Sequence, residues 1–259
     1  MGCSERKTPT GRGFWIWNLP KCEDGDLDRI VARCKAAGIT WLALKCGNDG
    51  NDWEKRFTPA IVDRLHAGGL LVYGWSYDTP NSRIANRVEV ARRCAADGAD
   101  GFITDCEIEW ERVADPDSAA AAYMTALRAA VPDEFALAHS PFDVIKYHQR
   151  FPYTALGAGC DFVVPQAYWP EHGTSEKAST ERALEQWGKY AKRHPQSAKQ
   201  VLLSGYSIKP DLKHGKPATV PDMLAFEQRC KAAGCPGVIY WVWDFTPAAV
   251  FDGLACTTY

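Results

Sequence analysis

The stretch Asp100-Gly101-Phe102-Ile103-Thr104-Asp105-Cys106-Glu107-Ile108-Glu109 is an apolar strand that ends in carboxylates. In an extended strand alternate side chains point to the same face, so Asp105 and Glu107 share one face, roughly 6.6 Å apart along the strand. Two like charges this close, partly removed from water, raise the pKa of at least one carboxyl group. A general acid needs such a group. The alternative is that these carboxylates cap a helix or bind a cation.

Short β-rich segments alternate with helical segments along the whole chain. The candidate strands are residues 13–17, 40–45, 70–77, 101–107, 135–140, 162–168, 201–206 and 237–243. The candidate helices are residues 27–37, 59–67, 84–97, 117–131, a short piece around 147–157, 181–193, 221–233 and 247–254. Alternating strands and helices form a parallel sheet, and continuous apolar strands indicate that both of its faces are covered. Eight such units predict a single-domain (β/α)8 TIM barrel over residues 1–259, with residues 1–12 as a flexible N-terminal segment.

A weak internal repeat supports this interpretation. Arg33-Cys34-Lys35-Ala36-Ala37-Gly38 recurs as Arg229-Cys230-Lys231-Ala232-Ala233-Gly234, with Arg93-Cys94-Ala95-Ala96-Asp97-Gly98 as a looser copy. In each copy a helix is expected to end at a glycine in the left-handed conformation, and a strand follows within a few residues. The three equivalent cysteines are then small apolar side chains packed against the sheet.

Composition argues against several classes of function. The formal net charge is −2, the isoelectric point is near 6.3 and no basic block occurs, so neither a nucleic-acid nor a membrane partner is expected. No stretch approaches the roughly 20 apolar residues of a membrane span. The polar N-terminus lacks the apolar core of a secretory signal, which predicts a protein that is cytoplasmic as synthesised. A phage-type lysin would be released from there to the cell wall.

The ten cysteines include no CxxC pair, and without a signal peptide reduced thiols are expected. No cysteine or histidine cluster has the spacing of a zinc site, and dinucleotide, P-loop, HExxH and GxSxG motifs are missing from the sequence. The sequence therefore predicts neither a metal nor another cofactor. It leaves the oligomeric state open.

In a TIM barrel the functional side chains lie at the carboxyl ends of the strands. This rule selects Asp105 and Glu107 as catalytic candidates. It selects as substrate-binding candidates Trp17, Lys45, Trp75, Tyr77, His139, Gln166, Tyr168, Trp169, Tyr206, Trp243 and Asp244. The set is rich in aromatic rings and carboxylates. Aromatic faces suit the C–H faces of a sugar ring, and a carboxyl group beside a carboxylate is the apparatus of glycoside hydrolysis.

Some of these candidates have alternatives. Trp241 and Trp243 lie two residues apart on one expected face, and we assign Trp241 to the barrel interior and Trp243 to the site. Lys45 either pairs with the carboxylates or is a Schiff-base lysine, and the acids nearby favour the pair. His139 is the one histidine assigned to the site, while the other five are placed on helices or loops. Asp78 and Asp244 are candidates for a second catalytic carboxylate.

Here the residues resemble a known group of enzymes. Asp100-Gly101-Phe102 followed by Asp105-x-Glu107 resembles the strand-four signature DGxDxDxE of glycoside hydrolase family 18 chitinases, and its DxE core is similar to that of family 25 lysozymes. The resemblance implies that Glu107 is the proton donor and that Asp105 positions the substrate acetamido group or stabilises developing charge. Two departures stand out. Ile103 replaces the first aspartate of the inner chitinase pair, and Trp169 follows Tyr168 where the family has an aspartate.

Two further segments carry the resemblance. Gln166-Ala167-Tyr168 resembles the sixth-strand segment that faces the acetamido group in the chitinases, and Trp241-x-Trp243-Asp244 is similar to the eighth-strand segment whose tryptophan lies under the cleaved sugar.

The sequence thus predicts a glycoside hydrolase that cleaves a β-linked, N-acetylated polysaccharide, with peptidoglycan as the leading candidate. Two other functions stay open, namely a catalytically silent carbohydrate-binding barrel and a Schiff-base lyase or aldolase that uses Lys45.

Overall fold

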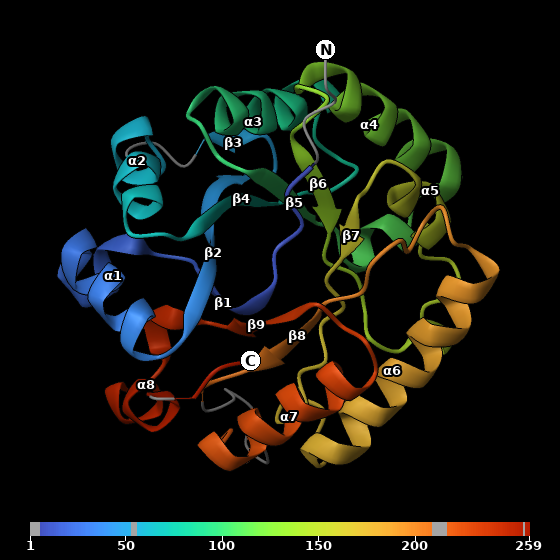
Figure 1. Ribbon diagram of the computed structural model, residues 1–259. Helices are drawn as coiled ribbons and strands as arrows, with labels where there is room; N and C mark the ends of the chain where they lie inside the picture. Colours follow the sequence, from blue (N-terminus) through green and yellow to red (C-terminus); the bar gives the residue numbers. More distant parts are fainter. Residues whose placement is uncertain (1–5, 53–55, 209–216, 256) are drawn as a thin grey trace.

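The predicted strands form the centre of the molecule, and the helices surround them (Figure 1). The computed structural model describes residues 6–52, 56–208, 217–255 and 257–259. The strands are β1 (Gly11–Ile16), β2 (Ile39–Asn48), β3 (Asn51–Asp52), β4 (Leu71–Tyr77), β5 (Gly101–Asp105), β6 (Ala136–His139), β7 (Phe162–Val163), β8 (Leu203–Tyr206) and β9 (Gly237–Trp241). The α-helices are α1 (Leu27–Ala36), α2 (Pro59–Ala67), α3 (Ile84–Ala96), α4 (Pro116–Ala130), α5 (Tyr153–Ala158), α6 (Glu176–Arg193), α7 (Val220–Ala232) and α8 (Ala248–Leu254).

Parallel pairing runs through eight strands in the order β7-β6-β5-β4-β2-β1-β9-β8, and β3 adds an antiparallel pair to the end of β2. Between β8 and β7 the barrel closes through single bridges rather than a continuous ladder. Val163 bridges Val201, Gln166 bridges Ser204, and the Leu202 N–H donates to the Val163 carbonyl at 2.9 Å. The predicted (β/α)8 TIM barrel is therefore confirmed.

Several boundaries differ from prediction, and two of these differences have an evident local cause. The strand expected over 162–168 ends at Val163, because Pro165 has no N–H to donate to a sheet ladder. The helix expected from residue 181 begins at Glu176, because the Ser175 side chain accepts a hydrogen bond from the Ala178 N–H and caps it. The piece expected around 147–157 consists of a 3-10 turn, Ile145–Tyr147, and α5.

Side chains that point into the barrel form a separate core of large rings and small residues. Its largest members are Trp15, Trp41, Tyr73, Trp75 and Phe162, all at most 2% exposed. Small partners make room for them, since a Cβ added at Gly13 would lie 2.3 Å from the Trp41 ring. The interior is thus filled, as in other TIM barrels, and a ligand site is expected at the carboxyl end of the strands.

The internal repeat has the predicted structural basis. α1, α3 and α7 end just before Gly38, Gly98 and Gly234, whose φ angles are 63°, 90° and 84°. These positive values favour glycine at the C′ position of a helix. The equivalent cysteines Cys34, Cys94 and Cys230 are at most 1% exposed and pack as apolar side chains. Eight cysteines are described, all buried and none in a disulfide, while Cys3 and Cys256 lie outside the described residues.

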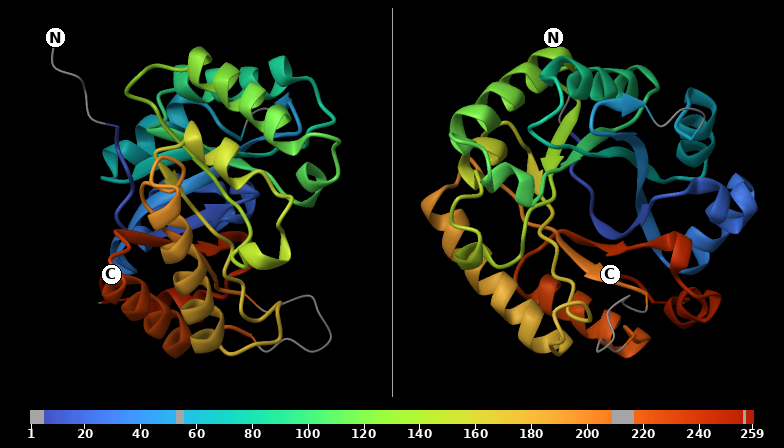
Figure 2. Two further views of the ribbon diagram at one scale, coloured as in Figure 1. Left: turned by 90° about the vertical axis from the view of Figure 1, so that its right-hand side faces the viewer. Right: turned by 180° about the vertical axis from the view of Figure 1, so that it is seen from behind.

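The N-terminal segment is ordered over more residues than expected. β1 begins at Gly11, Arg6 pairs with Asp161 at 2.8 Å, and Lys7 pairs with Asp100 at 2.6 Å. These contacts hold residues 6–10 across the amino-terminal end of the barrel, on the same side as the C-terminal end of the chain (Figure 2). Residues 1–5 lie outside the described residues. Among the described helices, none has the length and apolar character needed to cross a membrane.

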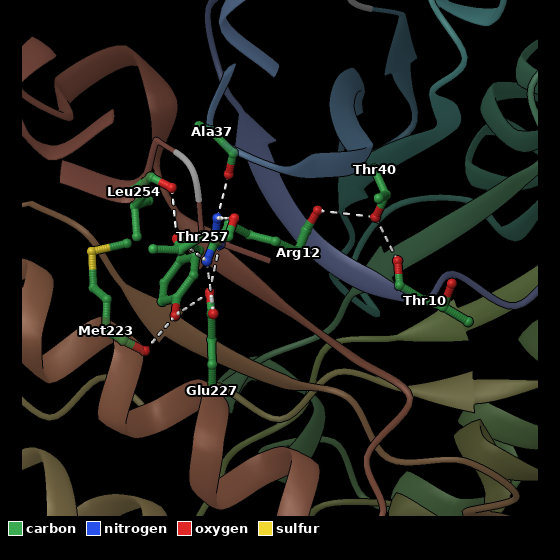
Figure 3. Close-up of polar contacts among 9 residues, drawn as sticks. Thr10, Arg12, Ala37, Thr40, Met223, Glu227, Leu254 and Thr257 are labelled. Atoms are coloured by element: carbon green, nitrogen blue, oxygen red, sulfur yellow. Dashed lines mark hydrogen bonds and ion pairs between the residues drawn. The ribbon is translucent and has the colours of Figure 1, made fainter. Parts of the chain in front are cut away.

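A buried ion pair links β1 to α7 (Figure 3). The Arg12 guanidinium, fully buried on β1, donates Nε to Glu227 Oε1 at 2.6 Å and Nη2 to Oε2 at 2.8 Å. Arg12 also donates to the carbonyls of Ala37 and Thr257 and to the Thr257 hydroxyl. The Tyr240 hydroxyl donates to Glu227 at 3.1 Å. Because nearly every polar atom has a partner, the buried charges are well compensated.

We predict that Glu227→Gln destabilises the fold by about 3–5 kcal/mol, because it leaves the Arg12 charge buried without a counter-charge. Urea unfolding at pH 7 measures this loss. The matched control is Glu185→Gln on α6, where both partners of the Glu185–Lys189 pair are 62% exposed and the loss should stay below about 1 kcal/mol. Equal losses in the two variants would contradict the assigned role of the buried pair.

Candidate active site

Asp105 and Glu107 lie at the carboxyl end of β5 and point to the same side. Ile103 on the same strand belongs to the barrel interior, so alternation directs Asp105 inward. Glu107 follows the strand with extended backbone (φ −124°, ψ −152°), which continues this alternation. Its carboxylate makes no capping hydrogen bond to the 3-10 turn Ile108–Glu111 that follows. The capping alternative therefore fails for Glu107.

Gln166 connects the carboxylate pair to the neighbouring barrel wall. Its Nε2 donates to Asp105 Oδ1 at 3.0 Å and to the Ser140 hydroxyl at 3.2 Å. It also contributes a hydrogen bond that stabilises the ionised form of Glu107. One amide thus fixes the position of both carboxyl groups relative to β6 and β7.

Burial is the main influence on the acidity of the pair. It raises the pKa of Asp105 well above its usual value, and the charges of Glu107 and Asp78 raise it further, while Lys45 and Gln166 oppose the shift. Burial also raises the pKa of Glu107, where Gln166 opposes the shift and the Glu109 and Glu171 carboxylates add to it. The site therefore holds a proton between the two carboxyl groups to higher pH than isolated acids would. This is the protonation state that acid catalysis needs.

Lys45 lies among aromatic rings next to the carboxylates. Its Nζ is 4.7 Å from the centre of the Trp75 ring and 5.1 Å from that of Trp17. Burial lowers the pKa of Lys45, whereas the carboxylate charges of Asp105 and Asp78 raise it. The lysine thus lies near enough to the carboxylates for their charges to interact, which is the arrangement that the paired alternative requires.

Tyr77 and Tyr206 hold two further carboxylates at the edges of the site. Tyr77 pairs in register with Asp105, and burial together with a hydrogen bond to Glu109 raises the pKa of its hydroxyl. The Tyr206 hydroxyl donates to Glu171 Oε1 at 2.5 Å. Tyr206 is only 2% exposed, so it supports the site from behind.

A cavity of about 710 Å³ opens beside the pair. One side is lined by Asp105, Glu107, Gln166, Tyr168 and Trp241. The other side is formed by residues that follow β6 and β7 and by the start of α6. The Trp241 ring lies 6.5 Å from Tyr168, 6.1 Å from Trp17 and 5.7 Å from Trp75, between centroids. Trp241 and Tyr168 line the cavity, whereas Trp17 and Trp75, both predicted to bind substrate, lie behind Trp241 and do not line it; Trp75 belongs to the interior core.

Trp243 does not lie in this cavity, contrary to prediction. β9 ends at Trp241, and a 3-10 turn, Trp243–Phe245, follows, so the alternation assumed for 241–243 does not continue. Trp243 instead packs outside the barrel against Phe14 and Phe251, with centroid distances of 5.8 and 4.6 Å. Trp241, assigned from sequence to the interior, takes the position at the cavity.

Trp169 and His139 are also core residues. Trp169 is 3% exposed and packs on Phe226 of α7. His139 is fully buried, in register with Thr104 on the outward face of the sheet, while Ser140 reaches Gln166 on the inner side. Neither ring nitrogen of His139 has a hydrogen-bond partner among the described residues. Burial lowers its pKa to about 3, so the ring is neutral.

The two candidates for a second carboxylate are engaged elsewhere. Asp78 is fully buried and accepts hydrogen bonds from the hydroxyls of Ser76, Thr104 and Tyr123, all at 2.9 Å. These partners place its carboxylate outside the barrel wall, under α4, and burial raises its pKa to about 6. Asp244 accepts hydrogen bonds from the N–H groups of Trp17 and Asn18 and so fixes the end of β1. Neither lines the cavity.

Sequence reasoning missed most of the second side of the cavity. Asp143, Glu171 and Arg182 were not singled out, and His148 and His172 were placed only on helices or loops. These residues lie in the loops after β6 and β7 or on α6, where strand alternation no longer determines which way a side chain points. The histidine at 214 lies outside the described residues. Within the described part of the chain, no group of three or more His, Cys, Asp or Glu side chains is arranged to hold a metal ion.

No protein-family model matches this sequence, and a search of curated proteins finds no match. Solved structures do match over nearly the whole chain. The PgaB (BpsB) glycoside hydrolase domain from Bordetella bronchiseptica has a TM-score of 0.65 at 14% identity, covering 96% of this chain and 100% of its own. A chitinase from Chromobacterium violaceum ATCC 12472 has a TM-score of 0.68 at 11% identity, with 95% and 98% covered.

The spore cortex-lytic enzyme SleL from Bacillus megaterium QM B1551 is similar over 95% of this chain and 72% of its own, with a TM-score of 0.65 at 12% identity. At such identities the likeness shows a shared fold. The structural neighbours are glycoside hydrolase barrels.

The neutral buried state of His139 predicts a pH-dependent stability. Its folded pKa of about 3 lies below the roughly 6.5 of an unfolded histidine, so the unfolded chain binds the proton more tightly. The free energy of unfolding is therefore unaffected by this group above about pH 6.5, and it falls as the pH drops from there toward 3. Between pH 7 and pH 5 this one group should cost the wild type about 2 kcal/mol.

Urea unfolding at pH 7 and pH 5 measures this effect in the wild type and in His139→Gln. The variant should not show the decrease of about 2 kcal/mol between the two pH values, whatever its stability at pH 7. His194→Gln, at the end of α6, is the matched control and should keep the wild-type dependence. Parallel pH profiles for the wild type and His139→Gln would show that His139 is not held neutral by burial.

Proposed function

We propose that this protein is a glycoside hydrolase that cleaves a β-linked, N-acetylated polysaccharide, with Glu107 as general acid and Asp105 as its partner. The observation that carries the proposal is the pair of buried Asp105 and partly buried Glu107 on a cavity walled by Trp241 and Tyr168. Raised carboxyl pKa values, an aromatic wall and a position at the carboxyl end of a barrel are the features that glycoside hydrolysis uses.

In the proposed reaction, protonated Glu107 donates its proton to the glycosidic oxygen, and the bond from that oxygen to the anomeric carbon breaks. Positive charge develops at the anomeric carbon. Asp78 and Asp244 are turned away from the cavity. Of the two other carboxylates that line it, Glu171 accepts a hydrogen bond from Tyr206, and Asp143 lies beside His172 and Arg182. The substrate's own acetamido oxygen is then the nucleophile, and Asp105 orients the acetamido group and stabilises its charge. The Glu107 carboxylate next removes a proton from the water that completes hydrolysis.

The substrate class follows from this chemistry together with the structural neighbours. An acetamido group is needed for substrate assistance, and it occurs on the sugars of chitin and peptidoglycan. A chitinase and a spore cortex-lytic enzyme are among the similar structures. We favour peptidoglycan as the natural substrate, and digestion of purified cell walls beside chitin oligosaccharides and acetamido-free β-glycans tests this choice.

The other two functions find less support. A silent sugar-binding barrel would not need to place a buried Asp105 beside a partly buried Glu107, which is costly unless a proton is bound there. A Schiff-base enzyme is favoured by the lowered pKa of Lys45. Lys45 is 6% exposed, however, and does not line the cavity. Borohydride trapping with a carbonyl substrate would detect such an intermediate and separate this function from the glycosidase.

We predict that Glu107→Gln lowers turnover at least about 100-fold on any glycan the wild type cleaves, because the amide keeps the shape but has no proton to transfer. Thermal stability should stay near that of the wild type. Glu134→Gln, an exposed position before β6 at the opposite end of the barrel, is the matched control and should retain activity. Substantial activity in Glu107→Gln would remove Glu107 from the mechanism.

We predict that Asp105→Asn strongly reduces turnover of N-acetylated oligosaccharides, mainly through kcat, because the charge that stabilises the acetamido-derived intermediate is lost. Release of reducing ends from chitin oligosaccharides measures the effect. If the Asn variant is as active as the wild type, substrate assistance is wrong, and a protein nucleophile must be sought.

A further inference from the structure

The cavity continues past the catalytic pair into a polar recess. Its volume of about 710 Å³ lies within the roughly 300–1,000 Å³ that holds a drug-sized ligand, more than one sugar ring requires. The recess is formed by Asp143, which follows β6, by His172 and Thr174, which follow β7, and by Arg182 on α6. The proposed reaction uses none of these four side chains.

Asp143 is the central group of the recess. It is 3% exposed, and its Oδ2 has no hydrogen-bond partner among the described residues. The nearest cationic atoms are His172 Nδ1 at 3.9 Å and Arg182 Nη2 at 3.8 Å. Both distances allow charge attraction but are too long for a hydrogen bond. A buried carboxylate oxygen in this state is costly unless something else satisfies it.

Two more polar atoms of the same recess are unsatisfied. Thr174 Oγ1 and Arg182 Nε are both buried, and within the described residues neither has a hydrogen-bond partner. Together with Asp143 Oδ2 they provide one acceptor, one donor and one hydroxyl that can do either. Three unsatisfied polar atoms from three segments around one cavity indicate a site shaped for a polar ligand.

The chemistry of the recess selects the ligand. A hydroxyl group about 2.8 Å from each partner can lie between Asp143 and the cationic side chains, donating to the carboxylate and accepting from Arg182 or His172. An anion would face the Asp143 carboxylate, and an ammonium group would face Arg182. The wall beside the recess is aromatic, because the Phe142 ring stacks on His148 at 3.5 Å with 7° between planes. An apolar face beside hydroxyl-binding groups fits an uncharged sugar ring.

We propose that Asp143, His172, Thr174 and Arg182 form a second sugar subsite, which binds hydroxyl groups of an uncharged pyranose ring next to the sugar held at Asp105 and Glu107. This proposal rests on the proposed function, since it assumes that the cavity receives a glycan. It adds a preference: substrates long enough to place a ring in this subsite bind more tightly than shorter ones.

The test measures binding in the Glu107→Gln background, so that the probes are not consumed. Calorimetry with chitin oligosaccharides of two to six residues should show affinity that rises with length. Asp143→Ala and Arg182→Gln should each reduce the affinity for the longest probe about 10-fold or more, and should flatten the gain with length. Asp143→Asn, which keeps the shape, should give a smaller loss and guards against misfolding of the Ala variant.

Glu185→Gln and Lys189→Gln are the matched controls, because both lie on α6 and form an exposed ion pair with each other. They should bind all probes as the parent does. Unchanged affinities in folded Asp143→Ala and Arg182→Gln would overturn the subsite. Tighter binding of deacetylated, amine-bearing oligosaccharides that depends on Asp143 would also overturn it, because the recess would then be an ammonium site.

The two proposals can fail separately. Length-dependent binding that needs Asp143 in a protein that hydrolyses no glycan supports the subsite and refutes the hydrolase. Hydrolysis that needs Glu107 but is indifferent to Asp143 and Arg182 at every substrate length supports the hydrolase and refutes the subsite.

Discussion

The inward and outward alternation of side chains on a closed parallel barrel decides which residues can meet in this protein. On β5, Ile103 fills the interior and Asp105 reaches the open end, while Thr104 between them points outward and binds Asp78 under α4. Acidic groups of neighbouring strands are thus separated by the barrel wall. The catalytic candidates face the cavity, and Asp78 contributes to the packing of the helices. A shift of one residue in β5 would exchange these environments.

Asp105 can be buried beside the partly buried Glu107 because the surroundings compensate in part for the lost hydration of the two carboxyl groups. Gln166 donates a hydrogen bond to Asp105, and the Lys45 ammonium lies nearby over two aromatic rings. The remaining cost is expressed as raised pKa values. Glu227 receives two hydrogen bonds from the Arg12 guanidinium. An arginine placed in the same way beside Asp105 and Glu107 would favour the ionised form of both carboxyl groups, and neither could then act as an acid. Incomplete compensation is therefore the property that makes the pair suitable for proton transfer.

The sequence was sufficient for the fold because periodicity, helix-ending glycines and strand spacing all agree, and because the strand ends of a barrel converge by geometry. The same logic places Gln166 and Tyr168 beside Asp105. It fails where a strand stops: Trp243 and Trp169 lie past the ends of β9 and β7, and they turn into the outer core. His139 is still within β6, but its side chain points outward, whereas that of the next residue, Ser140, points inward. Asp143 and Arg182 come together only through the path of loops and the start of α6, for which the sequence offers no periodic signal.

The buried ion pair at the amino end of the barrel and the polar recess at its carboxyl end differ in how completely their polar groups are satisfied. At the amino end Arg12, Glu227 and Thr257 share a network in which hydrogen bonds are direct and short. At the carboxyl end Asp143 Oδ2, Thr174 Oγ1 and Arg182 Nε are buried without such bonds within the described residues. Unsatisfied buried groups lower stability, and those of the recess, unlike the ring nitrogens of His139, belong to residues that line a cavity. Well-paired groups at one end supply stability that the rest of the fold shares, which allows the other end to keep polar atoms ready for a substrate.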